Sequence, residues 1–258
     1  MSIIAADIGN STVTIGILKG TGIDVYRIGS RPVLTPSDYK MSLRNFMDIS
    51  RVPGAAGAVI CSVVPDVVEP LSEALKDICE CQPMIVTNSS AFGLTLDVEN
   101  PDTLGTDRVA SAMGALRIAD PPIAIIDFGT ATTVNFVAPG PDGTAVFIGG
   151  AILPGLGLMG HALASNTSQL PRVDQGGVVR LPGKNTQESI LAGLTYATAG
   201  GVERILEEVE QATGLKYRVI VTGGLLEYAA AFIRRPTRRE PALTLRGLFA
   251  MYEQNGRP

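Results

Sequence analysis

The feature that most constrains the fold is a short polar motif that interrupts an apolar run at two places in the chain. Near the N-terminus the run is "IIAADIGNSTVTIGIL", and residues 123–138 repeat the arrangement as "IAIIDFGTATTVNFVA". Both stretches contain the pattern D-x-G-x-x-T, and its equivalent positions are Asp7 and Asp127, Gly9 and Gly129, and Thr12 and Thr132. One such stretch is typical of a β-hairpin turn. Two copies at nearly half the chain length indicate a duplicated domain.

Strand and helix signals alternate in both halves. Apolar strand-like runs are "AAGAVICSVV", "PMIVT" and "YRVIVTGG". Between them lie segments with helical spacing of apolar residues, such as "VVEPLSEALKDIC" and "TQESILAGLTYATAGGVERILEEVEQATG". This alternation predicts an α/β protein with mixed sheets. The pair Pro121-Pro122 marks the expected boundary, which gives an N-terminal lobe of residues 1–120 and a C-terminal lobe of residues 121–258.

Composition narrows the cellular setting. The opening apolar stretch is interrupted at Asp7, and no later apolar stretch approaches the roughly 20 residues needed to span a bilayer. We therefore expect no membrane anchor. The three cysteines, Cys61, Cys79 and Cys81, are odd in number and have no zinc-ligand spacing. We therefore expect free thiols in a reducing cytoplasm.

Charge argues against a nucleic-acid partner. The net charge of the chain is −4. Its one basic cluster surrounds Pro236 and consists of Arg234, Arg235, Arg238 and Arg239. We interpret this cluster as a solvated loop rather than as a surface that follows a phosphate backbone.

The two hairpins have the chemistry of a nucleotide site. Gly9 and Gly129 would let the backbone approach phosphate without a Cβ in the way. The carboxylates would repel phosphate directly, so their useful role is to hold a cation, or water on a cation, that bridges to it. Paired hairpins across a cleft are how the actin and sugar-kinase class of folds holds ATP. In that class a glycine pair after a late strand lies against adenosine. The stretch "VIVTGG" fits this element, although for the stretch taken alone we favour a plain strand-end turn.

Two other nucleotide motifs are rejected. The chain has no P-loop pattern G-x-x-x-x-G-K-[ST]. Gly155, Gly157 and Gly160 do spell G-x-G-x-x-G, but the pattern follows "AILP", with Pro154 at the junction, and a lone glycine pattern is a weak signal of a dinucleotide site. We interpret these glycines as a close-packed loop that enters a helix.

Several short motifs occur in the chain in an order that is typical of one known family. They are "DIGNSTVTIGIL", "SVVP", "GTDR", "DFGTATT", "GGAILPG", "LP", "GKNT", "VTGG" and "LTLRGLFAMYEQN". From residue 3 to about residue 255 the chain resembles type III pantothenate kinase, a family of the actin, sugar-kinase and Hsp70 ATPase superfamily. The resemblance implies a duplicated actin-like (ribonuclease H-like) fold with two lobes around an ATP cleft.

The family's activity follows as an expectation. The resemblance implies ATP-dependent phosphorylation of pantothenate to 4'-phosphopantothenate, the first step of coenzyme A biosynthesis. It also implies a cytoplasmic homodimer that needs Mg²⁺ or another divalent cation, together with K⁺ or NH₄⁺ as a monovalent cation.

The resemblance assigns roles to residues. Asp7 would hold Mg²⁺ through water, Asp127 would bind the monovalent cation, and Asp107 would be the general base that takes the proton of the pantothenate hydroxyl. The ATP-binding positions would be Asp7, Gly9, Asn10, Ser11, Thr12, Thr14, Gly129, Thr130, Gly223 and Gly224. The substrate-binding positions would be Gly105, Thr106, Asp107, Arg108 and, near the dimer interface, Thr186.

Several of these residues also have purely structural explanations. Asp107 and Arg108 at a helix start would serve as a cap and a surface ion pair, and Thr186 would cap the helix that follows it. His161 is the only histidine, and for it we favour a helix-start or packing role over catalysis.

The chain also departs from the family pattern. The family usually has Thr-Asn where this chain has Ser11-Thr12, and it commonly places a tyrosine shortly before G-x-D-R, where "LTLDVENPDTLGTDR" has none. Two alternatives therefore remain, a same-fold kinase for another small hydroxy compound and a regulatory homologue without catalysis. The basic cluster supports the regulator, whereas the retained Asp7, Asp107 and Asp127 oppose it.

Overall fold

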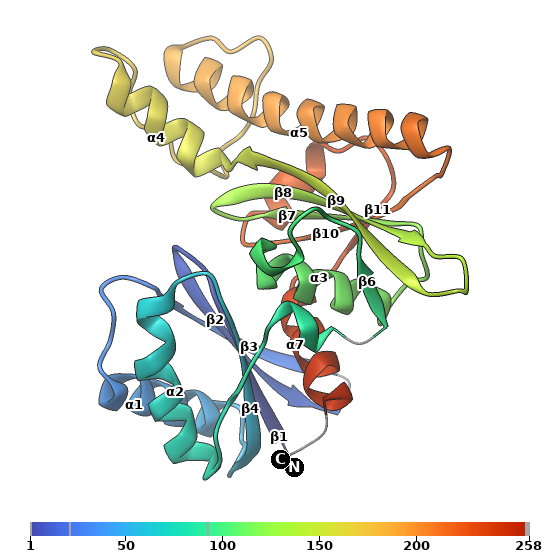
Figure 1. Cartoon of the computed structure of the whole chain (residues 1–258). Helices are drawn as coiled ribbons and strands as arrows, with labels where there is room; N and C mark the ends of the chain where they lie inside the picture. The colour runs from blue at the N-terminus through green and yellow to red at the C-terminus, as the bar shows by residue number, and fades with distance from the viewer. Residues whose placement is uncertain (1, 21, 92, 256–258) are drawn as a thin grey trace. The chain divides into compact units, whose positions relative to one another are not determined.

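The computed structural model describes residues 2–20, 22–91 and 93–255, which form two compact units (Figure 1). Unit 1 comprises residues 1–119 together with 242–258, and unit 2 comprises residues 120–241. Each unit has a mixed sheet with helices packed against it, so the predicted α/β class is confirmed.

The sheet of unit 1 has the strand order β3-β2-β1-β4-β5. Strand β2 is antiparallel to its neighbours β1 and β3, whereas β4 is parallel to both β1 and β5. The strands are β1 (Ser2–Ile8), β2 (Thr12–Lys19), β3 (Gly22–Gly29), β4 (Ala55–Ser62) and β5 (Met84–Ile85). The predicted hairpin after Asp7 is therefore the β1–β2 connection.

Helices cover both faces of this sheet. The side chains of Ile4, Ala6 and Ile8 alternate along β1 toward one face, where they join the core formed with α1 and α2. Helix α7 lies on the opposite face and contacts β1, β2 and β4. The helices of unit 1 are α1 (Pro36–Ile49), α2 (Pro65–Cys79), α3 (Thr106–Leu116) and α7 (Leu243–Gln254), with the short turns η1 (Asn88–Ser90) and η2 (Pro101–Thr103) and the strand β6 (Leu94–Leu96).

The C-terminal helix α7 groups with unit 1, although it follows unit 2 in sequence. It packs closely on α3 because two glycines leave room for backbone contact. A Cβ at Gly247 would overlap the carbonyl oxygen of Ala110, and one at Gly114 would overlap that of Leu243. The lobe of residues 121–258 expected from the sequence would have placed this helix with the second half. The compact unit ends at Pro241 instead.

Unit 2 repeats the strand arrangement of unit 1. Its strands follow the order β11-β10-β7-β8-β9, with β8 antiparallel to β7 and β9 and with β10 parallel to β7 and β11. They are β7 (Ile123–Phe128), β8 (Ala131–Pro139), β9 (Ala145–Pro154), β10 (Arg218–Thr222) and β11 (Thr237–Arg239). Read from the other end, as β9-β8-β7-β10-β11, this order corresponds strand by strand to β3-β2-β1-β4-β5 of unit 1, and the strand directions agree as well. The duplication is therefore confirmed.

The register of the two hairpins corrects one equivalence drawn from the sequence. In the first hairpin Ile8 pairs with Val13, but in the second Phe128 pairs with Thr132. The second turn, residues 129–131, is therefore one residue shorter than the first, residues 9–12. Thr132 occupies the place of Val13 and is buried, so its alignment with Thr12 is wrong.

Helix α5 of unit 2 is the longest helix among the described residues. Its N-terminal cap is Asn185, whose side chain accepts a hydrogen bond from the backbone N–H of Glu188, and it ends at Gly214 in the left-handed conformation. The helices are α4 (Leu156–Asn166), α5 (Thr186–Thr213) and α6 (Leu226–Ala229), followed by the turn η3 (Ala230–Phe232).

Candidate functional site

Asp7 lies at the C-terminal end of β1, which is the first strand of the first hairpin and the central strand of its sheet. In the parallel pair β1–β4 it stands opposite Cys61, whose Sγ donates a hydrogen bond to Asp7 Oδ1 at 3.2 Å. In the antiparallel pair β1–β2 it stands opposite Thr14. Directly opposed residues share a face of the sheet, so Thr14 and Cys61 flank the carboxylate.

Two carboxylates affect each other in unit 1. Burial raises the pKa of Asp7 to about 6, the hydrogen bond from Cys61 opposes this rise, and the negative charge of Asp107 adds to it. Burial also raises the pKa of the Cys61 thiol well above its usual range, with a further contribution from the charge of Asp7. Asp7 and Asp107, separated by about a hundred residues of sequence, are thus brought into one electrostatic environment.

Asp107 lies in the first turn of α3. Its Oδ1 accepts a hydrogen bond from the backbone N–H of Arg108 at 2.9 Å, and α3 begins after Gly105 without a side-chain cap. The hydroxyl of Thr106 donates to the carbonyl oxygen of Ser62 at 3.5 Å, which ties the start of α3 to the end of β4. Burial lowers the pKa of Arg108, and the charge of Asp107 opposes this shift. The G-x-D-R motif therefore lies at the same end of the sheet as Asp7.

The loop before this motif is held by Asn88, which the sequence analysis did not identify. Its Nδ2 donates to the carbonyl oxygens of Leu104 at 2.8 Å and Pro101 at 2.5 Å. The segment where the family commonly has a tyrosine forms the turn η2 here. An asparagine far from the motif in sequence gives no local signal of this role.

A buried serine supports the first hairpin turn. The N–H of Gly9 donates to Thr12 O at 3.0 Å, and the hydroxyl of Ser30 donates to Gly9 O at 2.6 Å. The backbone N–H of Ser30 also donates to Ser11 O at 3.1 Å. Asn10 and Ser11 are exposed, so the tip of the turn is accessible to a ligand. Ser30 follows β3 and was also missed.

In unit 2, Asp127 has the same strand-end position as Asp7. It stands opposite Thr222 of β10 and opposite Thr133 of β8. The next residue along from β10, Gly223, has φ +101°, and a Cβ there would overlap Asp127 Oδ1. A Cβ at Gly224 meets nothing within 4 Å. The glycine pair is therefore more than a strand-end turn, because Gly223 is required for the approach of the Asp127 carboxylate.

The second turn is covered by the start of α4. The N–H of Gly155 donates to Thr130 O at 3.1 Å, and a Cβ at Gly155 would overlap the carbonyl oxygens of Gly129 and Thr130. The side chain of Thr130 itself lies at the exposed end of the turn. Gly155 is thus a packing glycine at the start of a helix, which agrees with our interpretation of the G-x-G-x-x-G pattern.

The structure decides two other structural alternatives. Thr186 is exposed and is the first residue of α5, while Asn185 caps the helix, so the expected capping role of Thr186 is wrong. His161 is exposed within α4, where its Nδ1 lies 3.2 Å from Ser165 Oγ. A packing role for His161 is therefore wrong as well, since its ring faces solvent rather than the core.

The basic cluster is also corrected. Part of it forms β11, and two of its arginines pair with acids, Arg235 with Glu210 at 2.9 Å and Arg239 with Glu227 at 2.5 Å. Burial opposes ionisation of Glu210, but hydrogen bonds from Lys216 and the Tyr217 N–H, together with Arg235, lower its pKa overall. The cluster is thus partly a short strand with ion pairs rather than entirely a loop, while Arg234, Arg238 and Arg239 are exposed to solvent as expected.

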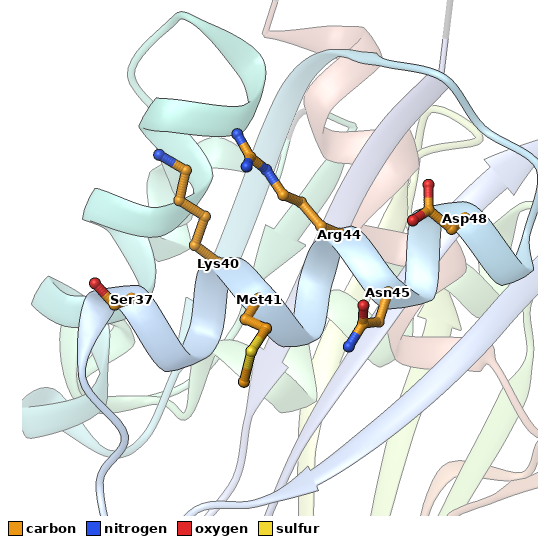
Figure 2. A pocket seen from close by; sticks show the side chains of 6 residues that line it. All are labelled: Ser37, Lys40, Met41, Arg44, Asn45 and Asp48. Atoms are coloured by element: carbon orange, nitrogen blue, oxygen red, sulfur yellow. The ribbon is translucent and has the colours of Figure 1, made fainter.

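Some features of the surface carry no site chemistry. Across the described ranges no helix is long and apolar enough to cross a membrane, and no group of three or more His, Cys, Asp or Glu residues could hold a metal ion. A hollow of about 390 Å³ lies on the exposed face of α1 (Figure 2). Its lining residues, all from this one helix, are Ser37, Lys40, Met41, Arg44, Asn45 and Asp48. None of them belongs to the predicted site.

The strand order and the paired carboxylate hairpins define an actin-like ATPase fold of the sugar-kinase class. Two solved structures with this fold cover most of the chain. A Campylobacter jejuni protein described as a Baf family transcriptional activator has a TM-score of 0.59 at 16% identity and covers 98% of both chains. The activator of the 2-hydroxyisocaproyl-CoA dehydratase from Clostridium difficile, with bound ADPNP, has a TM-score of 0.56 at 16% identity, over 99% of this chain and 96% of its own. At these identities the likeness shows the fold alone.

Sequence comparison identifies the family. The family model for type III pantothenate kinase matches residues 3–208. A protein named type III pantothenate kinase from Agathobacter rectalis is 32% identical over 259 residues, which cover 99% of this chain and 98% of the relative. The chain belongs to the type III pantothenate kinase family, and the kinase class predicted from its motifs is confirmed.

Proposed function

We propose that this protein transfers the γ-phosphoryl group of ATP to the hydroxyl group of pantothenate, giving 4'-phosphopantothenate and ADP. The observation that carries the proposal is the placement of Asp107 beside Asp7 at one end of the unit 1 sheet, where the charge of one raises the pKa of the other. A phosphoryl transfer needs a base at the acceptor and charge neutralisation at the phosphates; Asp107 is proposed as the base, and Asp7 as the group that holds the neutralising cation.

Asp107 is the proposed general base. It accepts the proton of the pantothenate hydroxyl as the oxygen attacks the γ-phosphorus and the bond to ADP breaks. Gly105, Thr106 and Arg108 are the proposed substrate contacts, and the guanidinium of Arg108 suits the carboxylate of pantothenate because it can bind both oxygens.

The residues around Asp7 fit a divalent cation. A carboxylate oxygen is a hard ligand of the kind that Mg²⁺ prefers, and among the described residues no basic side chain pairs with Asp7. When bound, the cation neutralises charge on the phosphates. The exposed turn that contains Asn10 and Ser11 is proposed to hold phosphate oxygens through its N–H and hydroxyl groups, together with Gly9, Thr12 and Thr14 of the same hairpin.

In unit 2 we propose Asp127 as the ligand of K⁺ or NH₄⁺. Because Gly223 has no Cβ, the Asp127 carboxylate lies against the backbone that follows β10, which holds its Oδ1 at the end of the sheet and supports this role. Gly129 and Thr130 are the proposed phosphate contacts of the second turn. The pair Gly223 and Gly224 is the proposed platform for adenosine.

A homodimer is proposed from the family resemblance, with Thr186 as a pantothenate contact near the interface. Unit 2 supplies apolar surface suited to such an interface, since several large apolar side chains there are exposed. They are Ile152, Leu158, Val178, Leu181 and Tyr196. A cytoplasmic location agrees with the free thiols of Cys61, Cys79 and Cys81.

The test is ADP release by purified protein with ATP, Mg²⁺ and pantothenate, in buffers that contain either K⁺ or Na⁺ as the monovalent cation. We expect turnover that depends on K⁺ and falls by at least about 10²-fold in Asp107→Asn, the scale of a lost general base. The matched control is Asp102→Asn, which removes an exposed carboxylate from the adjacent turn η2 and should keep wild-type turnover.

The outcomes separate the alternatives. ATP binding with no ADP release on pantothenate would refute the proposed acceptor. Release with another small hydroxy compound would then establish the second kinase reading, which the missing tyrosine supports. ATP binding without turnover on any acceptor would favour a regulatory homologue, although Arg235 and Arg239 are paired with acids and offer less positive surface than the sequence indicated.

A further inference from the structure

Cys61 touches the proposed metal-binding carboxylate but has no part in the reaction as described so far. It lies on β4, in the strand pair that places it directly opposite Asp7. Its side chain is fully buried, and its Sγ donates to Asp7 Oδ1 at 3.2 Å. This is the hydrogen bond that the structure gives to the Asp7 carboxylate.

We propose that Cys61 is a positioning residue, whose thiol fixes the orientation of the Asp7 carboxylate and leaves Oδ2 for the divalent cation or its water. The inference rests on the proposed role of Asp7. Cys61 touches neither substrate nor cation in this scheme and acts only through Asp7.

The need for such a partner follows from aspartate geometry. The terminal torsion of an aspartate side chain has a broad distribution, so a carboxylate without a donor samples many orientations. A donor on one oxygen selects one of them. The neighbouring strands β1 and β4 are held in register on both sides of the pair, from Ile3 opposite Gly57 to Ile8 opposite Ser62, so the thiol is delivered at a fixed place.

A thiol also suits this place electrostatically. A lysine or arginine would orient the carboxylate but would neutralise its charge and compete with the cation. A thiol is a weak, neutral donor, and Cys61 Sγ donates to Asp7 Oδ1 at 3.2 Å. The carboxylate is thereby oriented while its charge remains available to Mg²⁺.

The competing explanation is that Cys61 only fills space, since buried cysteine commonly behaves as a small apolar residue. Two substitutions separate the explanations. Cys61→Ser keeps a donor at the same position, whereas Cys61→Ala removes it. Cys79→Ala is the matched control, because Cys79 is also buried in unit 1 but packs within α2 in the core with no site residue.

The hydrogen bond can be observed without activity. The infrared S–H stretch of Cys61, isolated as the difference between wild type and Cys61→Ala, should lie at lower wavenumber than that of Cys79, isolated with Cys79→Ala. It should move when Asp7 is replaced in Asp7→Asn, whereas the Cys79 band should stay. A Cys61 band that is unshifted in Asp7→Asn and coincides with the Cys79 band would overturn the inference.

Cation binding gives the second readout. Mn²⁺ is a hard cation suited to carboxylate and water ligands, and its binding with ADP can be followed by electron paramagnetic resonance. We expect Cys61→Ala to weaken Mn²⁺ binding about tenfold, as for one lost hydrogen bond to a charged group, and Cys61→Ser to stay within about threefold of wild type. In turnover, Cys61→Ala should raise the Mg²⁺ concentration needed for half-maximal rate.

The two failures are distinguishable. If wild-type protein binds no Mn²⁺ with ADP, the role of Asp7 in the proposed function fails. If wild type binds Mn²⁺ and Cys61→Ala binds it equally well, only the role of Cys61 fails. Equal losses in Cys61→Ala, Cys61→Ser and Cys79→Ala would show a packing effect and would also overturn it.

Discussion

Replacing Asp7 by asparagine should stabilise the free protein at neutral pH while it removes the proposed metal ligand. Burial first, and then the charge of Asp107, raises the pKa of Asp7 from 3.8 to about 6. A group whose pKa is raised by folding contributes fully to the free energy of unfolding when the pH is below its pKa in the unfolded state. This contribution is lost as the pH rises through its pKa in the folded state. The wild-type protein therefore holds an unfavourable carboxylate above pH 6, and Asp7→Asn does not.

The magnitude follows from the two pKa values. Their separation of about two units corresponds to at most about 3 kcal/mol, at 1.36 kcal/mol for each unit. About half of this loss of stability, roughly 1.4 kcal/mol, occurs as the pH rises from 5 to 8, and the rest occurs below pH 5. The asparagine oxygen can still accept the hydrogen bond of Cys61, so the substitution changes charge more than packing.

The assay is urea unfolding of the free protein in EDTA at several values between pH 5 and pH 8. The free energy of unfolding of Asp7→Asn minus that of wild type should increase with pH over this range. Asp102→Asn, which removes an exposed carboxylate, controls for the loss of one negative charge. A difference that is independent of pH, or that decreases toward pH 8, would refute the reasoning that Asp7 is a buried and electrostatically opposed carboxylate.

Three further predictions concern other parts of the structure. Gly223→Ala should destabilise the protein by about 1–3 kcal/mol and abolish the response to K⁺, because residue 223 has φ +101° and a Cβ there would overlap Asp127 Oδ1. Thermal unfolding measures the first effect and turnover in K⁺ the second, with Gly224→Ala as the control. Ser30→Ala should weaken ATP binding, measured by calorimetry, because it leaves a hairpin carbonyl without its hydroxyl donor. Glu210→Gln should destabilise unit 2 by about 1–2 kcal/mol at pH 7. Since the pKa of Glu210 is lowered, the difference in free energy of unfolding between wild type and variant should shrink as the pH falls below 4.5. A difference that stays constant with pH would contradict this prediction.

The local part of the fold could be predicted from the sequence. The apolar runs that end at Asp7 and Asp127 became β1 and β7, and the helical spacing of residues 186–213 became α5. These features depend on near neighbours in the chain, where the periods of strand and helix are visible in the order of residues. The G-x-D-R motif was placed correctly at a helix start for the same reason.

The non-local contacts could not be predicted in the same way. The packing of α7 on α3 depends on Gly114 and Gly247, which remove side chains and so leave no apolar periodicity to read. Cys61 meets Asp7 only through the parallel pairing of β1 with β4, and the sequence analysis treated it as a free thiol. Ser30 likewise reaches the first turn only after β3 has folded back along β2.

The two duplicated hairpins differ in turn length and in the groups that support each turn. The first turn, residues 9–12, closes on itself through Gly9 N–H to Thr12 O and is supported from behind by the buried hydroxyl of Ser30. The second, residues 129–131, is one residue shorter; it also closes on itself, through Gly129 N–H to Ala131 O, and it accepts a further hydrogen bond from Gly155 at the start of α4. Because a Cβ at Gly155 would overlap the carbonyl oxygens of that turn, α4 can take this position only if residue 155 is glycine. The two D-x-G turns thus place a carboxylate at the end of β1 and of β7 and both close on themselves, while a serine supports the first turn and the start of a helix supports the second.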